Sequence, residues 1–318
     1  MRAVVVGAGS WGSVFTALLA ERGHEVVLAC RDPEQAAAIR RTGRNPRYMR
    51  ELDLAAVDAR PMGEAPVAQA ELVCLAVPSR AFRAVVEELS GKAPVLSLAK
   101  GLDPATGERL SQVVGDRPVA VLSGPNHAEE IADGLPAAAV IASEDAELAA
   151  RLQNALMSPR FRVYVNPDLA GVELCAAAKN VIALAAGAVD GLGFGDNAKA
   201  ALVARGLAEM ARLGDAYGAR AETFAGLAGL GDLVVTCWSR HSRNRRAGEL
   251  IAGGLPPAEV EAEIGMVAEG LTTAPVLREL SRRLDIELPI TDAVCAVLEG
   301  ASLGDLVADL MERRPTGE

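Results

Sequence analysis

Short apolar runs alternate with Ala- and Leu-rich helical stretches along the first half of the chain. The runs that are compact enough for buried strands lie at 2–6, 25–29, 72–76, 95–99, 119–122, 137–142 and 161–165. Helical patterns separate several of them, at 13–22, 79–89, 107–114 and 126–133. Because continuous apolar strands that alternate with helices are typical of a parallel sheet covered on both faces, we expect an α/β fold.

The pattern changes near residue 167, after which it is almost entirely helical. Expected helices lie at 168–189, 198–217, 221–228, 245–251, 257–263, 272–284, 290–298 and 303–313. A glycine-rich turn at 191–197 precedes one of them, with Asn197 as the expected N-cap. We therefore expect a sheet domain at 1–167 and an all-α domain at 168–318, whose last residues, 312–318, are polar and frayed.

A glycine-rich turn joins the first predicted strand to the first predicted helix. Gly7, Gly9 and Gly12 have the spacing GxGxxG. In such a turn the first glycine bends the chain, the second admits a pyrophosphate and the third lets helix pack on strand. Free amides at the helix start face the anion. The motif within a β-α-β unit predicts a Rossmann-type dinucleotide-binding domain, and a turn without ligand is the alternative.

The end of the second predicted strand carries two opposing signals about the cofactor. Arg31 could pair with a 2′-phosphate and favour NADP(H), or it could be a solvated loop cation. Asp32 could instead bond the ribose hydroxyls of NAD(H). The sequence therefore leaves NADP(H) and NAD(H) both open.

Charge and cysteine usage narrow the possible partners. A net charge of -10 argues against nucleic acid or an anionic membrane, but not against a small anionic ligand. The 5 cysteines lie far apart, without metal-finger spacing, and indicate reduced thiols in a cytoplasmic compartment. No uncharged apolar run reaches the roughly 18 residues of a membrane helix, so we expect no membrane insertion.

The second half carries the residues with candidate chemistry. Lys179 and Asn180 interrupt an Ala- and Leu-rich helix. Burial of Lys179 would lower its pKa toward the range useful for acid–base catalysis, whereas a solvent-facing lysine is an equal alternative. Asp232 follows a glycine-rich turn and could hold Lys179 and substrate hydroxyls, or cap a helix.

A cluster of arginines precedes another predicted helix. Its members are Arg240, Arg243, Arg245 and Arg246. Arginine forks beside a helix N-terminus predict a phosphate site. A solvated cationic face and a nucleic-acid patch are the alternatives, and the acidic, aromatic-poor chain disfavours the second.

Taken together, these stretches resemble bacterial NAD(P)H-dependent glycerol-3-phosphate dehydrogenase. The matching blocks are GAGSWG (7–12), SLAKGL (97–102), SGP (123–125), AAAKNVIALAAG (176–187), DGLGFGDNAKAAL (190–202), GLGDLVVTC (229–237), SRNRR (242–246) and AEGLTTA (268–274). The blocks span most of the chain in the expected order, and their combination is specific although single blocks are not.

The resemblance implies a role for each matching residue. Catalysis would fall to Lys179 as proton donor or acceptor, to its partner Asp232 and to Lys100. The substrate residues would be Lys100, Gly124, Asn126, Lys179, Asp232, Ser242, Arg243 and Asn244. The cofactor residues would be Gly7, Gly9, Ser10, Trp11, Gly12, Arg31, Lys100, Ala128, Arg243, Val267 and Glu269. No metal is implied.

One dipeptide departs from the family pattern. Asn126 and His127 stand where the family more often has a small hydroxyl residue followed by Phe. Asn126 can still hydrogen-bond a substrate hydroxyl or carbonyl. His127 is the alternative general base, and Lys179 is the better match.

The implied activity is reduction of dihydroxyacetone phosphate to sn-glycerol 3-phosphate, which supplies phospholipid synthesis. The resemblance also implies a homodimer formed through the helical domain. Two alternatives remain: a hydroxyacid dehydrogenase of the same architecture, and a regulator that senses NADP(H) without turnover. The enzymatic reading requires Lys179, Asp232 and Arg243 to meet beside the nicotinamide.

Overall fold

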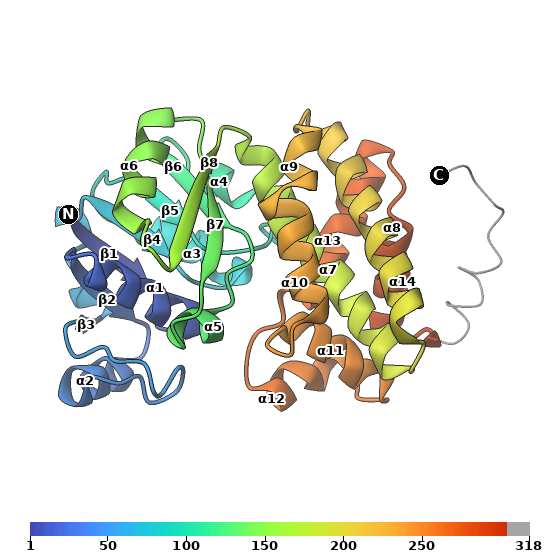
Figure 1. Ribbon diagram of the computed structural model, residues 1–318, viewed down its shortest axis with the longest axis horizontal. Coiled ribbons are helices and arrows are strands. Elements are labelled where there is room, and N and C mark those ends of the chain that lie inside the picture. Colours follow the sequence, from blue (N-terminus) through green and yellow to red (C-terminus); the bar gives the residue numbers. More distant parts are fainter. Residues whose placement is uncertain (304–318) are drawn as a thin grey trace.

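The computed structural model describes residues 1–303, which form a sheet domain and a helical domain lying side by side (Figure 1). The sheet has 8 strands in the order β3-β2-β1-β4-β5-β6-β7-β8. Its strands are β1 (Arg2–Val6), β2 (Glu25–Cys30), β3 (Asp58–Pro61), β4 (Leu72–Leu75), β5 (Val95–Ser97), β6 (Val119–Ser123), β7 (Ala137–Ala142) and β8 (Phe161–Asn166). Neighbouring strands run parallel except β6 and β7, so the expected largely parallel sheet is confirmed.

The order of the strands decides where a ligand can bind. β1 lies between β2 and β4, so the chain crosses from one side of β1 to the other after β3. In doubly wound folds, ligands bind beyond the carboxyl ends of the strands at this reversal. The glycine turn follows β1 directly and therefore lies at that position.

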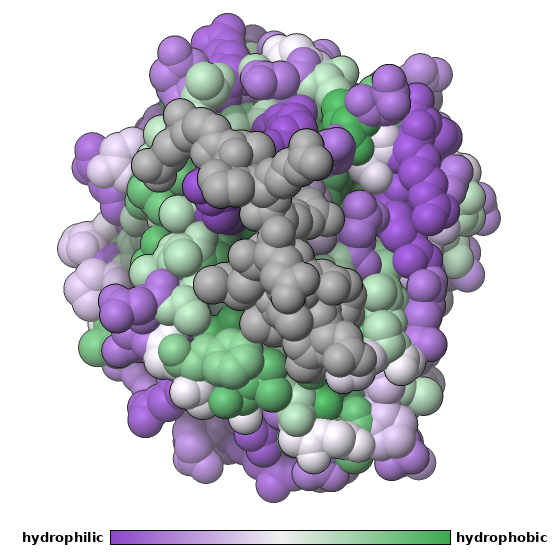
Figure 2. Space-filling view, turned by 90° about the vertical axis from the view of Figure 1, so that its right-hand side faces the viewer, coloured by the Kyte–Doolittle hydropathy of each residue, from purple (hydrophilic) through white to green (hydrophobic). Residues whose placement is uncertain are grey.

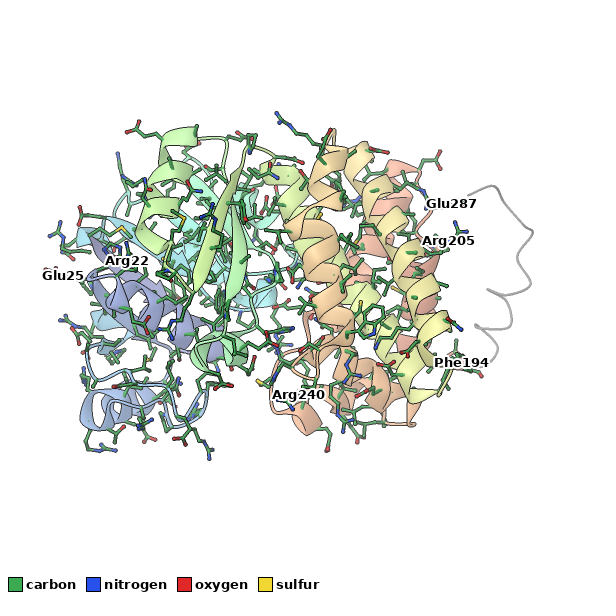
Figure 3. All side chains as sticks on the ribbon, viewed as in Figure 1. Arg22, Glu25, Phe194, Arg205, Arg240 and Glu287 are labelled. Atoms are coloured by element: carbon green, nitrogen blue, oxygen red, sulfur yellow. The ribbon has the colours of Figure 1, made fainter. Side chains whose placement is uncertain are left out.

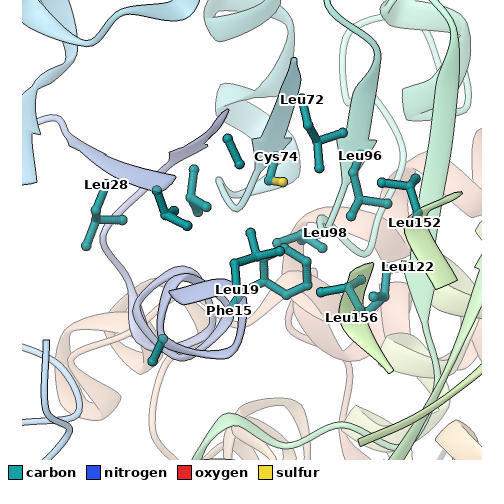
Figure 4. Packing of buried hydrophobic residues seen from close by; sticks show 14 of the residues in the cluster. Phe15, Leu19, Leu28, Leu72, Cys74, Leu96, Leu98, Leu122, Leu152 and Leu156 are labelled. Atoms are coloured by element: carbon teal, nitrogen blue, oxygen red, sulfur yellow. The ribbon is translucent and has the colours of Figure 1, made fainter. Parts of the chain in front are cut away.

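The helices of this domain pack on both faces of the sheet. They are α1 (Ser10–Glu21), α2 (Pro33–Thr42), α3 (Ser79–Glu87), α4 (Leu110–Val113), α5 (Ala128–Ala132) and α6 (Ala146–Leu156). Phe15 and Leu19 of α1 are fully buried, and Figure 4 shows them pointing toward Cys74, Leu96 and Leu98. Burial of one such large side chain stabilises the fold by about 1.5–3 kcal/mol, which fixes α1 and the turn before it.

Three elements of the sheet domain were missed from the hydrophobic pattern: β3, α2 and α6. β3 has polar residues and a proline because it is an edge strand that pairs with β2 alone. α2 starts with Asp32 as N-cap and ends at Gly43 in the left-handed region. These are local start and stop signals for a helix, but a helix with a narrow buried face does not produce a run of apolar residues.

The helical domain is organised around α7 (Leu169–Gly191), which is buried along most of its length. Around it lie α8 (Gly195–Ala216), α9 (Ala221–Ala225), α10 (Asp232–Trp238), α11 (Arg243–Ala252), α12 (Val260–Ile264), α13 (Glu269–Leu284) and α14 (Pro289–Leu298). α7 is long and apolar enough to cross a membrane, but 89% of its most apolar window is buried inside the protein. It is the core helix of this domain.

Two expectations in this domain were wrong, and two others lie largely or wholly outside the described residues. A glycine-rich turn was expected before Asp232, but Leu227–Gly231 forms a π-helix that continues into α10. Burial of Leu233 and Cys237 against neighbouring helices stabilises α10, although the Val-Val pair gives it low helix propensity. Asn197 does not cap α8, which already begins at Gly195. The helix expected at 303–313 and the polar end at 312–318 fall largely or wholly beyond residue 303.

Candidate active site

The three glycines of the turn have different surroundings. Gly7 has a φ of +107°, and a Cβ placed on it would lie 2.5 Å from the Ala76 carbonyl oxygen. A Cβ on Gly12 would lie 1.9 Å from the Gly7 carbonyl oxygen. Packing of the protein itself therefore requires both glycines. Nothing lies within 4 Å of a Cβ on Gly9, so the space beside this residue is open.

The open space beside Gly9 fits a dinucleotide pyrophosphate. No side chain caps the start of α1, and its first turn contains no acidic residue. The first N–H groups of the helix are thus free to face an anion. Trp11 follows, and its indole Nε1 is buried without a hydrogen-bond partner. These residues fit the cofactor that the glycine spacing predicts.

Segment 266–269 reaches from the helical domain to the sheet domain. The Met266 sulfur lies 4.0 Å from Ser10 Oγ, beside the glycine turn. Glu269 accepts hydrogen bonds from the N–H and the Oγ of Ser79, at 3.0 and 2.5 Å, where α3 begins. Burial raises the pKa of Glu269, and the hydrogen bonds from Ser79 and the charge of Arg243 oppose this rise. Val267, between these contacts, is half-buried.

A buried ion pair connects α7 with α10. Lys179, which is 4% exposed, donates to Asp232 Oδ1 at 2.6 Å and to Thr236 Oγ1 at 2.9 Å. Burial lowers the pKa of Lys179 to about 7, Asp232 opposes this shift and the nearby charge of Lys100 adds to it. A lysine with such a pKa can donate or accept a proton near neutral pH.

The other oxygen of Asp232 faces the sheet domain. Lys100, beyond the end of β5, donates to Asp232 Oδ2 at 3.0 Å, to Asn126 Oδ1 at 2.8 Å and to the Gly124 carbonyl at 3.1 Å. Burial raises the pKa of Asp232, but the charges of both lysines outweigh this effect and lower it to about 2. The carboxylate therefore stays ionised and holds an ammonium group from each domain.

His127 lies close to this cluster. Burial, followed by the charges of Lys179 and Lys100, lowers the pKa of His127 to about 4. Its ring Nε2 is buried without a hydrogen-bond partner, and the ring of His241 lies 6.2 Å away between centroids. A neutral imidazole of such low basicity is a poor general base, which favours Lys179.

The arginine cluster separates into residues with and without ion pairs. Arg245 binds Asp190 and Glu249, and Arg246 binds Glu249. Arg243 is exposed at the first position of α11 and has no ion pair among the described residues. Ser242 caps this helix by accepting a hydrogen bond from the Arg245 N–H at 3.2 Å.

Two asparagines connect the start of α11 with the lysines. Asn244 donates to Asn180 Oδ1 at 2.9 Å and accepts from the Gly270 N–H at 2.8 Å. Asn180 in turn donates to the Lys100 carbonyl at 2.9 Å. Of the three residues expected to meet, Lys179 and Asp232 are in direct contact. Arg243 is connected to them indirectly, because its neighbour Asn244 hydrogen-bonds Asn180, the neighbour of Lys179.

The remaining predicted residues lie at the edges of this arrangement. Ala128 is buried at the first position of α5, two residues after Asn126. Arg31 is exposed after β2, away from the lysine cluster along the sheet. Thr236, a hydrogen-bond partner of Lys179, was not predicted from the sequence. Its spacing of four residues from Asp232 would have revealed it, had α10 been predicted.

Known proteins resemble this chain over nearly its whole length. Family models described as the N-terminus and the C-terminus of NAD-dependent glycerol-3-phosphate dehydrogenase match residues 2–149 and 168–308. Glycerol-3-phosphate dehydrogenase [NAD(P)+] from Moorella thermoacetica is 49% identical over 99% of this chain and 96% of its own length. The enzyme from Desulfitobacterium hafniense is 46% identical over 97% of this chain and 90% of its own length.

A solved structure shows the same similarity. The crystal structure of glycerol-3-phosphate dehydrogenase from Coxiella burnetii covers 98% of this chain and 99% of its own, with a TM-score of 0.94 and 37% identity. A ketopantoate reductase from Ralstonia eutropha, at 20% identity and a TM-score of 0.62, shares the fold alone. The chain therefore belongs to the NAD(P)-dependent glycerol-3-phosphate dehydrogenase family.

Proposed function

We propose that this chain reduces dihydroxyacetone phosphate to sn-glycerol 3-phosphate, with Lys179 as the proton donor. The observation that carries the proposal is the buried Lys179 ammonium, 2.6 Å from an Asp232 carboxylate whose second oxygen binds Lys100. A hydroxyacid dehydrogenase of another substrate class and a regulator without turnover are not favoured, because neither needs this cluster together with Arg243.

Two lysines have different roles at the carbonyl group of the substrate. The reduced nicotinamide, when bound, supplies the hydride that reaches the ketone carbon. Lys179 gives a proton from Nζ to the carbonyl oxygen as the C–O double bond is reduced, and is left as a neutral amine. Burial favours this neutral amine, which is why its pKa lies near the working range. The Lys100 ammonium stabilises the negative charge that develops on the oxygen.

Asp232 fixes where both ammonium groups point. Each of its oxygens accepts from one lysine, and Oδ2 also lies 3.3 Å from Ser123 Oγ and from the Gly124 N–H. A carboxylate with this many donors cannot rotate without breaking several hydrogen bonds. It therefore positions the proton donor and does not itself take the proton.

The phosphate of the substrate is expected at the start of α11. Arg243 supplies a guanidinium that has no ion pair with any residue of 1–303, and Ser242 and Asn244 flank it. Asn244 uses one amide hydrogen and its oxygen within the protein, which leaves its second amide hydrogen for the ligand. Binding at the phosphate orients the distant carbonyl toward Lys179.

We assign the cofactor to the crevice that begins at the glycine turn. The residues proposed to hold it are Gly7, Gly9, Ser10, Trp11, Gly12, Arg31, Lys100, Ala128, Arg243, Val267 and Glu269. The contacts of Met266 with Ser10 and of Glu269 with Ser79 support this assignment, because they bring segment 266–269 over the same crevice.

A direct assay tests the function. The purified protein is mixed with NADPH and dihydroxyacetone phosphate, and loss of reduced-nicotinamide absorbance is followed. We expect rapid oxidation of the cofactor with this substrate and little with 2-oxo acids of similar size. Cofactor binding without oxidation would support the regulator, and oxidation with a 2-oxo acid alone would support the other dehydrogenase class.

The domain boundary and the cellular context are part of the proposal. We place the boundary at 167/168, between the end of β8 and Asp168, whose side chain caps α7. The cytoplasm is supported by the five free and buried cysteines. In that compartment the product would supply phospholipid synthesis.

A homodimer formed through the helical domain is the proposed assembly. Leu230, Val234 and Trp238 are 40–42% exposed at four-residue spacing, so they form an apolar face along the π-helix and α10. Apolar residues also gather on the end of the helical domain in Figure 2, and Figure 3 shows exposed Phe194 at that end. Sedimentation of the wild-type protein and of Trp238→Glu tests the assembly, and a concentration-independent monomer would contradict it.

A further inference from the structure

The carboxylate at the end of β2 is already occupied within the protein. Asp32 follows Gly12 by about 20 residues, the place where an acidic residue bonds the ribose hydroxyls in NAD-binding folds. Here Asp32 Oδ1 accepts from the Glu34 N–H at 2.9 Å and caps α2. Its Oδ2 accepts from Arg47 Nη2 at 2.5 Å.

Arg47 is brought to Asp32 by a loop that is fixed to the glycine turn. Asn45 is fully buried and donates to the Ala8 carbonyl at 3.0 Å and to Ser13 Oγ at 2.8 Å. Its oxygen accepts from the Arg47 N–H at 3.0 Å and from Gln35 Nε2 at 3.0 Å. Because Ala8 lies between the first two glycines of the turn, this loop keeps a constant position relative to the cofactor crevice.

The two cations at this end of the crevice remain accessible. The Arg47 side chain is 54% exposed although it pairs with Asp32, which is 25% exposed. Arg31 is exposed and has no ion pair within residues 1–303. Arg31 and Arg47 therefore supply two accessible guanidinium groups on the segments that adjoin the end of β2, one of them on the Asp32 carboxylate.

We propose that Arg47 selects a cofactor with a 2′-phosphate, because it neutralises Asp32 and, with Arg31, offers a pair of guanidinium groups to that phosphate. The 2′-hydroxyl of NAD(H) is usually bound by a carboxylate, and Arg47 neutralises the charge of Asp32 and takes up one acceptor site on its Oδ2. A 2′-phosphate needs planar donors with positive charge, which arginine supplies. The inference rests on the proposed function, since it assumes a dinucleotide along the glycine turn, and it resolves the choice between NADP(H) and NAD(H).

Calorimetry on the full chain isolates this end of the crevice from the reaction. Adenosine 2′,5′-bisphosphate and AMP differ only in the 2′-phosphate, and neither can react. We expect the bisphosphate to bind the wild-type protein at least about 10-fold more tightly than AMP, the effect of one charge-assisted contact. Arg47→Ala should reduce this ratio by about 10-fold and should strengthen AMP binding, because Asp32 becomes available.

Two further variants distinguish the effect of the Arg47–Asp32 pair from the effect of losing any positive charge in this region. Arg41→Ala removes the same charge at the far end of α2, where the side chain does not contact Asp32, and should leave the ratio unchanged. Asp32→Asn keeps an N-cap and removes the negative charge, so preference for the bisphosphate should persist or increase. Equal loss in Arg41→Ala and Arg47→Ala, or loss of AMP binding in Asp32→Asn, would overturn the proposal.

The steady-state ratio of kcat/KM with NADPH to that with NADH should follow the binding ratio in each variant. Turnover with both cofactors at equal efficiency, combined with equal binding of the two nucleotides, would refute the selection by Arg47 and leave the dehydrogenase assignment intact. Absence of binding of both nucleotides would refute the cofactor site, and with it this inference. Turnover failure with normal nucleotide binding would count only against the assigned reaction.

Discussion

Lys179 and Asp232, 53 positions apart in the sequence, are joined by a hydrogen bond of 2.6 Å in the core of the protein. Because the second oxygen of Asp232 binds Lys100 from the sheet domain, one carboxylate connects the two domains at the site. The acid–base chemistry thus depends on how the domains pack, and a change at either lysine is felt through the shared carboxylate.

Replacement of Lys179 tests its role in the reaction. Lys179→Met keeps most of the side-chain volume and removes the proton, so we expect turnover to fall by about 100-fold or more. Affinity for NADPH, measured by fluorescence titration, should remain near normal because the glycine turn is untouched. Lys92→Met, at an exposed lysine of the sheet domain, is the matched control. Turnover within a few-fold of wild type in Lys179→Met would remove this lysine from the chemistry.

The pH dependence follows from the lowered pKa of Lys179, about 7. Reduction needs the protonated lysine, so kcat/KM for dihydroxyacetone phosphate should fall as pH rises through this value. Oxidation of glycerol 3-phosphate needs the neutral amine and should rise over the same range. Asp232→Asn removes the charge that stabilises the ammonium form of Lys179 and so lowers the pKa of this lysine further. The reduction rate that remains in the variant should therefore decline at a lower pH than in the wild-type protein. A profile that does not move in this variant would speak against the ion pair.

Arg243 is expected to control affinity for the substrate. Arg243→Ala should weaken binding of dihydroxyacetone phosphate by about 2–5 kcal/mol if the phosphate contact is desolvated, with a smaller effect on kcat. Arg246→Ala removes an exposed arginine from the same helix and should leave KM close to wild type. The measurement is the substrate dependence of the initial rate. Equal KM values in the two variants would place the phosphate elsewhere.

The glycine turn gives a test that separates ligand binding from folding. Gly9→Ala places a methyl group in open space, so the melting temperature should stay within a few degrees while NADPH binding weakens by at least about 10-fold. Gly12→Ala brings a methyl group onto the Gly7 carbonyl and should lower the melting temperature itself. Calorimetric scans with and without NADPH compare the two. Unchanged NADPH binding in Gly9→Ala would show that no pyrophosphate approaches there.

Glu209 makes the stability of the helical domain depend on pH. It is buried on α8 and accepts from the N–H groups of Ile290 and Thr291 at the start of α14. Burial raises its pKa to about 7, above that of the unfolded chain. Its contribution is therefore full at acidic pH and is lost as pH rises through about 7.

Glu209→Gln keeps an acceptor and cannot ionise, so its stability should not show this loss. We therefore compare the free energy of unfolding of the variant with that of the wild-type protein at about pH 5 and about pH 8, on either side of the shifted pKa. The difference, variant minus wild type, should increase by on the order of 2–4 kcal/mol from the lower to the higher pH. Urea titrations at both pH values measure the difference, with Glu279→Gln, an exposed residue of α13, as control. A constant difference at both pH values would contradict the buried carboxyl.

Local features of the chain were sufficient to predict the sheet and the cofactor turn. β1 and its neighbours are runs of apolar residues, and a central strand of a parallel sheet must be apolar on both faces. The spacing of Gly7, Gly9 and Gly12 is equally local, because all three glycines lie within six consecutive residues of one strand–turn–helix segment. Elements held by packing with distant segments were missed: α10 has poor local propensity, and β3 is a strand only because β2 lies beside it.

The chemistry of individual side chains was decided by tertiary structure. The sequence left Lys179 equally open to burial and to solvent, because an Ala-rich helix does not reveal which of its faces will be covered. Its pKa depends on a carboxylate 53 positions away and on a second lysine from the other domain, neither of which has a local signature. The sequence likewise left Asp32 open as a ribose ligand, and the folded chain places the Arg47 guanidinium on its carboxylate. Burial and charge pairing are properties of contacts between segments, and only the folded chain defines those contacts.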